Sequence, residues 1–276
     1  FERINQGGKR LGLFDLVVAS TWSEDFDLKA KTNELNQEIK NRGFGKIDEE
    51  IISQTLSLVL SGHCTRSFQL QLTNKDIKKY WDIIEDGILL AIDFLKDNLG
   101  VKIYDFIPYP SIIAMVAYLF AKQDRRSLSA NQSSFVKEWF WKTAFSQRYG
   151  ASSLTVMGDD IKKYFEPLLS NKSVELKLPI SLSLNDIKDI QIYTRSAVKN
   201  AVFCLLAIQQ PRHFRNGSVI TLDRQICSEY NNHEKHHIFP KAFLKQNSIK
   251  HRHLLLNFAF IPSELNKEIS KEKPSK

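Results

Sequence analysis

Apolar residues recur at helical spacing through most of the first 210 residues, and this periodicity constrains the fold more than any other feature. The longest run begins at Thr73 and stops before Gly100. Its apolar positions repeat every three or four residues, as one buried face of a helix requires: Ile77, Trp81, Ile84, Ile88, Leu89, Ile92 and Leu95. Similar runs occupy 11–22, 51–62, 108–121, 135–150, 159–169 and 184–209. The sequence therefore predicts a mainly α fold with a helical bundle-like body.

Polar and turn-forming residues separate these runs. Residues 23–48 predict a weakly amphipathic helix followed by a glycine-containing loop, and residues 123–134 predict a Ser-rich linker. Asp159 and Asp160 are expected at a helix N-terminus, where carboxylates are favourable, rather than as an acid/base pair. The aromatic residues within 135–145 could stack on bases, but their spacing favours packing in a buried helix.

Composition is that of a typical soluble globular protein with room for two domains, since 42% of the 276 residues are hydrophobic and 25% are charged. The sequence contains no apolar run long enough to span a bilayer and no signal-peptide pattern. Cys64, Cys204 and Cys227 are odd in number and far apart, which favours free thiols in a reducing compartment. We therefore expect a cytoplasmic protein without a membrane partner, and an oligomer is compatible with the sequence.

Positive charge and histidine concentrate at the C-terminal end. Between Pro211 and Lys276 there are 12 Lys and Arg against 6 Asp and Glu, so this end carries +6 of the chain's net +8. The same stretch holds six of the seven histidines. This pattern is expected of a protein that contacts a phosphate backbone, although charge alone also fits a solvated basic tail.

The most specific motif lies at 233–241, where the sequence reads His-Glu-Lys-His-His-Ile-Phe-Pro-Lys. An amphipathic run and a basic loop follow it. The apolar run at 254–262 then has the length and the Phe and Ile content of a short strand. Ser263 is a candidate N-cap for a helix that contains Asn266. This order predicts a strand, a loop, a second strand and a helix.

Two adjacent histidines, a nearby proline and two downstream asparagines resemble the site of HNH endonucleases, whose fold is the small α+β ββα-metal finger. The resemblance implies catalytic roles for His237, as general base, and for Asn257, as the residue that pins the loop. It implies metal-binding roles for His236 and Asn266. Together these residues predict hydrolysis of DNA phosphodiester bonds.

One imidazole and one amide carbonyl leave room for water and phosphate around the cation, which suits one Mg²⁺ or Mn²⁺ per site. HNH members with a third histidine in place of Asn266 bind zinc more tightly than we expect here. Candidate contacts to the phosphates of DNA are Lys241, Lys267, Arg212 and Arg215, although the two arginines fit an ordinary surface turn equally well.

The opening Phe-Glu-Arg-Ile-Asn-Gln-Gly-Gly-Lys-Arg-Leu resembles a segment of GmrSD-type modification-dependent (type IV) restriction endonucleases. In that family a DGQQR motif lies upstream, on a ParB-like fold linked to nucleotide use. This chain contains no DGQQR and no P-loop, so nucleotide use is not assigned to it. The chain begins at Phe1, and we expect it to be a piece of a longer protein.

Three domains follow from these resemblances. Residues 1–72 are expected to be the truncated end of a DGQQR-family domain, 73–210 a helical domain, and 211–276 the HNH module. A basic turn at 211–217 marks the second boundary, and 218–224 alternates enough to form a strand. The implied function is a metal-dependent DNA endonuclease in prokaryotic defence against foreign or modified phage DNA.

Other interpretations of the motif remain open. The histidine pair also fits a buried pair beside a proline turn, and Glu234 either orients a histidine or is simply exposed. A structural zinc site would draw on Cys227, His233, His236, His251 and His253. The basic end could also bind nucleic acid without cleaving it, or a degenerate HNH module could serve contacts with a protein partner.

Overall fold

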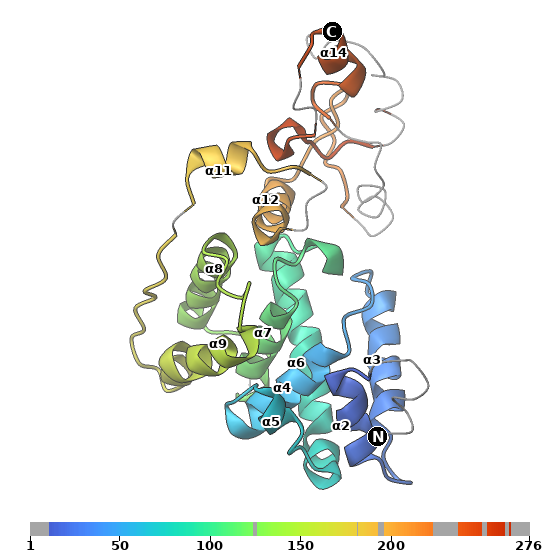
Figure 1. Ribbon diagram of the computed structural model, residues 1–276, viewed down its shortest axis with the longest axis vertical. Helices are drawn as coiled ribbons and strands as arrows, with labels where there is room; N and C mark the ends of the chain where they lie inside the picture. The colour runs from blue at the N-terminus through green and yellow to red at the C-terminus, as the bar shows by residue number, and fades with distance from the viewer. Residues whose placement is uncertain are drawn as a thin grey trace. The chain divides into compact units, whose positions relative to one another are not determined.

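The computed structural model describes residues 11–123, 126–180, 182–192, 196–222, 237–249, 253–262 and 265, and these residues are mainly helical (Figure 1). The chain divides into two compact units. The first comprises Phe1–Phe94, Tyr109–Thr143 and Arg148–Leu178, and the second comprises Leu95–Pro108, Ala144–Gln147 and Pro179–Lys276. The predicted domain boundaries after residues 72 and 210 stay predictions.

The first unit is a set of helices in chain order. They are α2 (Leu13–Thr21), α3 (Leu28–Asn41), α4 (Glu50–Ser61), α5 (Arg66–Gln69), most of α6 (Asn74–Leu99), α7 (Ser111–Ala121), most of α8 (Ala130–Phe145), α9 (Ser153–Asp160), the π-helix η2 (Ile161–Phe165) and α10 (Glu166–Leu169). These bounds confirm the helices predicted from the apolar runs between residues 11 and 121.

The core of this unit forms where α4 packs against α7. Every residue of α7 from Ser111 to Phe120 is buried, which explains why its sequence is apolar all round. Gly87 brings α6 close to α7, because a Cβ atom at this position would lie 3.0 Å from the Ala117 carbonyl oxygen. Gly62 ends α4 in a left-handed conformation with φ of 69°, a turn that glycine adopts without strain.

Helix α8 begins at Ala130, so the predicted linker at 123–134 is too long. The Ser129 amide donates to the Gln132 side-chain oxygen at 2.9 Å, and the Gln132 amide donates to the Ser129 hydroxyl at 3.2 Å. This reciprocal pair is a capping box, and its Ser-x-x-Gln signature is present in the sequence. Phe135, Trp139 and Phe140 are buried, which confirms the prediction of an aromatic core helix.

The expectation for Asp159 and Asp160 is wrong, because α9 begins at Ser153 and Asp160 is its last residue. The Asp160 carboxylate is fully buried. It accepts hydrogen bonds from the Arg148 guanidinium at 2.5–3.0 Å, from the Tyr149 hydroxyl at 2.9 Å and from the Trp139 indole at 3.4 Å. Asp160 is therefore a structural carboxylate that joins α9 to Trp139 of α8 and to the turn after α8.

The second unit contains η1 (Tyr104–Phe106), α11 (Leu184–Lys188), α12 (Ala197–Ile208), α14 (Lys241–Gln246) and η3 (Leu255–Asn257). The single helix predicted at 184–209 is therefore wrong. Its chain is interrupted because the Leu255 amide donates to the Ile190 carbonyl and the Ile192 amide donates to the His253 carbonyl, both at 2.8 Å. A new helix, α12, then begins after Ser196, whose hydroxyl caps it.

Neither predicted strand forms as a regular strand within the described residues. Residues 218–222 make one antiparallel bridge, between Arg212 and Val219. In the run 254–262, the 3₁₀ turn η3 replaces the first half, and Phe258 makes an isolated bridge with His237. The second unit thus brings these segments together by single bridges, and the predicted ββα arrangement stays a proposal.

Candidate functional site

The candidate site centres on His237, which lies in extended backbone opposite Phe258. The Ile238 amide donates to the Asn257 carbonyl at 2.9 Å, so the histidine segment is tied to the segment that follows η3. The His237 side chain is buried, with 8% of its surface exposed. The imidazole is therefore fixed inside the second unit rather than free on its surface.

Asn257 pins the loop after His237 through its side chain. Its Oδ1 atom accepts a hydrogen bond from the Phe239 amide at 2.8 Å, and its Nδ2 atom donates to the Phe239 carbonyl at 3.1 Å. The amide side chain of Asn257 thus binds both backbone polar groups of Phe239, the N–H and the carbonyl. We name this arrangement the Asn257 clamp. The catalytic role that the sequence resemblance implies for Asn257 stays a prediction.

An aromatic cluster of the second unit packs against the segment that follows Asn257 in the chain. Phe258 lies 4.9 Å from Phe203 of α12 between ring centroids, and Phe260 lies 5.7 Å from Phe106 of η1. All four rings are buried. Such rings contribute large buried apolar areas and favour tilted or edge-to-face contacts, so the backbone at Asn257 rests on a packed base.

A second histidine lies beside the candidate base. The rings of His237 and His253 are 5.5 Å apart and inclined by 67°. The backbone of His253 is held by its hydrogen bond with Ile192. Sequence reasoning considered His253 only as a zinc ligand, and no spacing signal could have placed it at 5.5 Å from His237.

The environment favours the neutral form of His237. Burial is the main cause, and the positive charge of Lys241 and the neighbouring His253 add to it, which together lower the pKa of His237 to about 4. Its buried Nε2 atom has no hydrogen-bond partner among the described residues. A neutral imidazole nitrogen that makes no hydrogen bond can accept a proton, which is the requirement for a general base.

The remaining predicted residues divide between described and undescribed parts of the chain. His236, Asn266 and Lys267 lie outside the described residues, as do Glu234 and four of the five candidate zinc ligands. The described residues contain no group of three or more His, Cys, Asp or Glu that could hold a metal ion. The structure therefore brings together His237, Asn257 and His253, and it leaves the predicted metal ligands as predictions.

The candidate phosphate-binding residues occupy two places in the second unit. Lys241 is the first residue of α14 and is close enough to influence the pKa of His237. Arg212 donates to the Gly217 carbonyl at 2.8 Å within the turn at 211–217, and Arg215 is exposed in the same turn. Arg212 thus has a structural contact in the turn, as the surface-loop interpretation expects.

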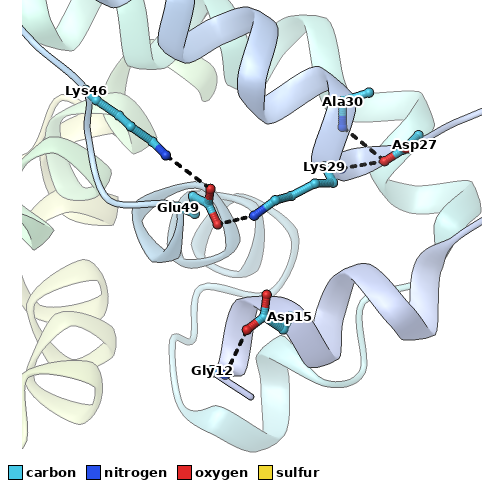
Figure 2. Close-up of polar contacts among 7 residues, drawn as sticks. All are labelled: Gly12, Asp15, Asp27, Lys29, Ala30, Lys46 and Glu49. Carbon is cyan, nitrogen blue, oxygen red and sulfur yellow. Dashed lines mark hydrogen bonds and ion pairs between the residues drawn. The ribbon is translucent and has the colours of Figure 1, made fainter. Parts of the chain in front are cut away.

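A separate cavity of about 620 Å³ lies in the first unit, beside the start of α2 and the start of α4. Figure 2 shows Lys29 and Lys46 pointing at Glu49, and Asp15 turned back to the Gly12 amide. The distances are 2.5 Å and 3.4 Å for the two ion pairs and 2.9 Å for the hydrogen bond. Because these charged groups satisfy one another, we assign no ligand to this cavity.

Both described cysteines are buried and outside any disulfide, as the sequence predicts for Cys64 and Cys204. Burial raises the pKa of the Cys64 thiol to about 12, so this sulfur is not a nucleophile at neutral pH. Cys227 lies outside the described residues. In the part of the chain that the structure describes, no helix has the length and apolar character needed to cross a membrane.

Comparison with known proteins adds a distant relative. The chain is similar to an uncharacterized protein of Methanocaldococcus jannaschii, with 28% identity over an alignment of 293 positions. The alignment covers the whole chain but 48% of that protein, so the chain spans about half the length of the curated relative it matches. No family model matches the chain.

Proposed function

We propose that this chain carries the catalytic end of a metal-dependent DNA endonuclease of the HNH type. The observation that supports this most strongly is the Asn257 clamp. It fixes the backbone two residues after His237, whose buried Nε2 atom has no partner among the described residues. A rigidly held, neutral imidazole beside a basic chain segment fits the hydrolysis of a phosphodiester bond.

In the proposed mechanism, His237 removes a proton from the attacking water at Nε2. A base with a pKa of about 4 is weak by itself. An anionic phosphate near the imidazole stabilises the protonated form and raises this pKa towards the working pH. His237 therefore becomes a stronger base when DNA is bound, and Asn257 keeps the loop in place while the charge changes.

The predicted ligands of Mg²⁺ or Mn²⁺ are His236 and Asn266. When bound, the cation supplies Lewis-acid polarisation of the scissile phosphate and stabilisation of the leaving oxygen. Lys241, Lys267 and Arg215 would position the DNA backbone, with Arg212 supporting the turn that presents Arg215. This site and the predicted strand and helix around it form the proposed ββα module.

The biological role proposed is prokaryotic defence against foreign or modified phage DNA, carried out in the cytoplasm. The support is the resemblance of the N-terminal segment to GmrSD-type restriction endonucleases. The chain matches about half of its longer relative, which is compatible with recognition functions elsewhere in a full-length protein.

The test is conversion of supercoiled plasmid to nicked or linear DNA by the purified chain with Mg²⁺ or Mn²⁺. The expected result is metal-dependent cleavage that EDTA abolishes. Parallel reactions on plain, hydroxymethylated and glucosylated DNA measure any substrate preference. Absence of cleavage with both cations on all three substrates would contradict the proposal for this chain.

A second candidate function is nucleic-acid binding without cleavage, which the concentration of positive charge between residues 211 and 276 favours. It predicts binding that needs no metal, weakens steeply with salt and is unaffected by His237→Ala. Cleavage by the wild-type chain that disappears in this variant would exclude it.

A further inference from the structure

Two phenylalanines near the candidate base in the sequence form an aromatic pair, in which Phe239 is exposed and Phe243 is half-buried. The ring centroids of Phe239 and Phe243 lie 6.2 Å apart, and the rings are inclined by only 26°. Phe239 is 44% exposed although its backbone is held by the Asn257 clamp. This pair therefore presents a preformed apolar surface to a ligand.

The Asn257 clamp also fixes the position of this pair. The clamp holds the Phe239 amide and carbonyl, and the neighbouring Ile238 amide is bonded to the Asn257 carbonyl. Phe243 lies on α14, one turn after Pro240, and its carbonyl accepts from the Asn247 amide at 3.1 Å. Because little backbone freedom remains to be lost, binding to these rings has a small ordering cost.

Two lysines share the short helix that carries Phe243. Lys241 and Lys245 lie on the same short helix as Phe243, and Lys245 is exposed. Aromatic rings interleaved with lysines match a nucleic-acid strand, whose bases have apolar faces and whose backbone is anionic. The segment from residue 237 to residue 249 itself contains no carboxylate.

We propose that Phe239, supported by Phe243, stacks on a base of the cleaved strand next to the scissile phosphate. The inference rests on the proposed function, because it takes DNA as the ligand of the His237 site. Only one residue separates Phe239 from His237 in the sequence. A base that leaves the duplex to stack on Phe239 would therefore place its own phosphate close to the imidazole.

This arrangement gives a substrate preference. Unstacking a base from a duplex costs a few kcal/mol, and the cost is smallest where the base is mismatched or already single-stranded. The site should therefore prefer single-stranded or locally unpaired DNA over a perfect duplex of the same sequence. Stacking on an aromatic side chain is sequence-tolerant, since every base has a π face.

The test uses the full chain in EDTA and an oligonucleotide containing 2-aminopurine, whose fluorescence falls when the base stacks. Binding is measured by anisotropy for the wild type, Phe239→Leu, Phe239→Tyr and the remote control Trp22→Ala. Trp22 is an exposed aromatic residue of the first unit. Phe239→Leu keeps an apolar side chain and removes the ring, whereas Phe239→Tyr keeps the ring.

We expect quenching on binding by the wild type, Phe239→Tyr and Trp22→Ala. Phe239→Leu should lose the quenching and bind single-stranded DNA roughly ten-fold more weakly. Equal quenching by Phe239→Leu, or binding without quenching by the wild type, would overturn the stacking proposal. So would a failure of the wild type to bind the oligonucleotide.

Plasmid cleavage with Mg²⁺ or Mn²⁺, measured on the same preparations, separates this inference from the proposed function. Quenching without cleavage supports the aromatic contact and counts against the nuclease activity. Cleavage without quenching supports the nuclease and overturns the aromatic contact.

Discussion

The pKa of His237 is lowered by burial, so its ionisation is coupled to folding. Its pKa is about 4 in the folded chain and 6.5 in an unfolded one, so the unfolded chain binds more protons between these values. The free energy of unfolding therefore rises with pH across this window, and the contribution of His237 is lost as the pH falls from 6.5 to 4. Between pH 7 and pH 5, the free energy of unfolding falls by about 2 kcal/mol because of His237.

This pH dependence can be measured by denaturant unfolding of the wild type and of His237→Gln, which does not ionise. The wild type should lose about 2 kcal/mol more than the variant between pH 7 and pH 5. The difference between the two proteins removes the contribution of carboxylates that titrate in both. Identical pH profiles would contradict the lowered pKa.

Asn257 gives a second prediction at the scale of one residue. Asn257→Ala removes both hydrogen bonds of the clamp, and we expect a loss of about 1–2 kcal/mol in the free energy of unfolding. We also expect a large loss of DNA cleavage, since the loop beside His237 is no longer fixed. The measurements are chemical denaturation and plasmid nicking.

Asn247→Ala is the matched control for this variant. The Asn247 side chain donates one exposed hydrogen bond, to the Phe243 carbonyl at 2.8 Å, and takes no part in the two hydrogen bonds of the clamp. Loss of this hydrogen bond in Asn247→Ala should reduce the free energy of unfolding by roughly 0.5 kcal/mol and leave DNA cleavage near the wild-type rate. Equal losses of cleavage in the two variants would contradict a specific role for Asn257.

At the scale of helices, Arg148 in the turn after α8 forms an ion pair with Asp160 at the end of α9, and this pair is partly buried because only the Asp160 side chain is fully inaccessible. The hydrogen bonds with Asp160 raise the pKa of Arg148. Arg148→Ala leaves the carboxylate buried without its cation, and such a change typically costs about 3–5 kcal/mol. Thermal and chemical denaturation measure this loss.

The matched control is Arg126→Ala, which removes an ion pair with Asp86 whose side chains are mostly exposed. Surface pairs of this kind contribute at most about 1 kcal/mol. We therefore expect a clear difference between the two variants. A loss below 1 kcal/mol in Arg148→Ala would show that water or another cation replaces the guanidinium.

The sequence predicted the helices well where the apolar period was unbroken, as in α4, α6 and α7. The sequence-based prediction of helices failed where a contact between distant residues determined the local backbone conformation. The chain between α11 and α12 leaves the helical conformation because its backbone pairs with residues 253–255, and local periodicity does not contain this information. The start of α8 was missed although its capping signature is visible in the sequence.

The candidate site shows the same division. The motif identified His237 and Asn257, which the structure brings together although 20 positions separate them in the chain. The partners of the clamp could not be predicted, because Phe239 contributes backbone atoms that carry no sequence signal. Asp160 was misassigned because its partner, Arg148, lies twelve residues earlier, in the turn between α8 and α9. Only the folded chain reveals that the Asp160 side chain is buried.

At the scale of the whole molecule, basic residues and histidines concentrate in the last 66 residues, and the helical body precedes them. Such a distribution is expected of a protein whose basic end contacts a phosphate backbone. The 28% identity to a protein of about twice the length extends over the entire chain, so the relative also contains a counterpart of both parts. The cleavage chemistry assigned to the C-terminal end is the central proposal for the molecule.

The most direct measurement compares wild type with His237→Ala for plasmid cleavage and, by calorimetry, for Mn²⁺ binding. The predicted result is a loss of cleavage by roughly 10²–10⁴-fold, because a general base contributes a factor of this size. Mn²⁺ binding should persist in the variant, since His237 is not a predicted ligand. Cleavage by His237→Ala at the wild-type rate would contradict the account.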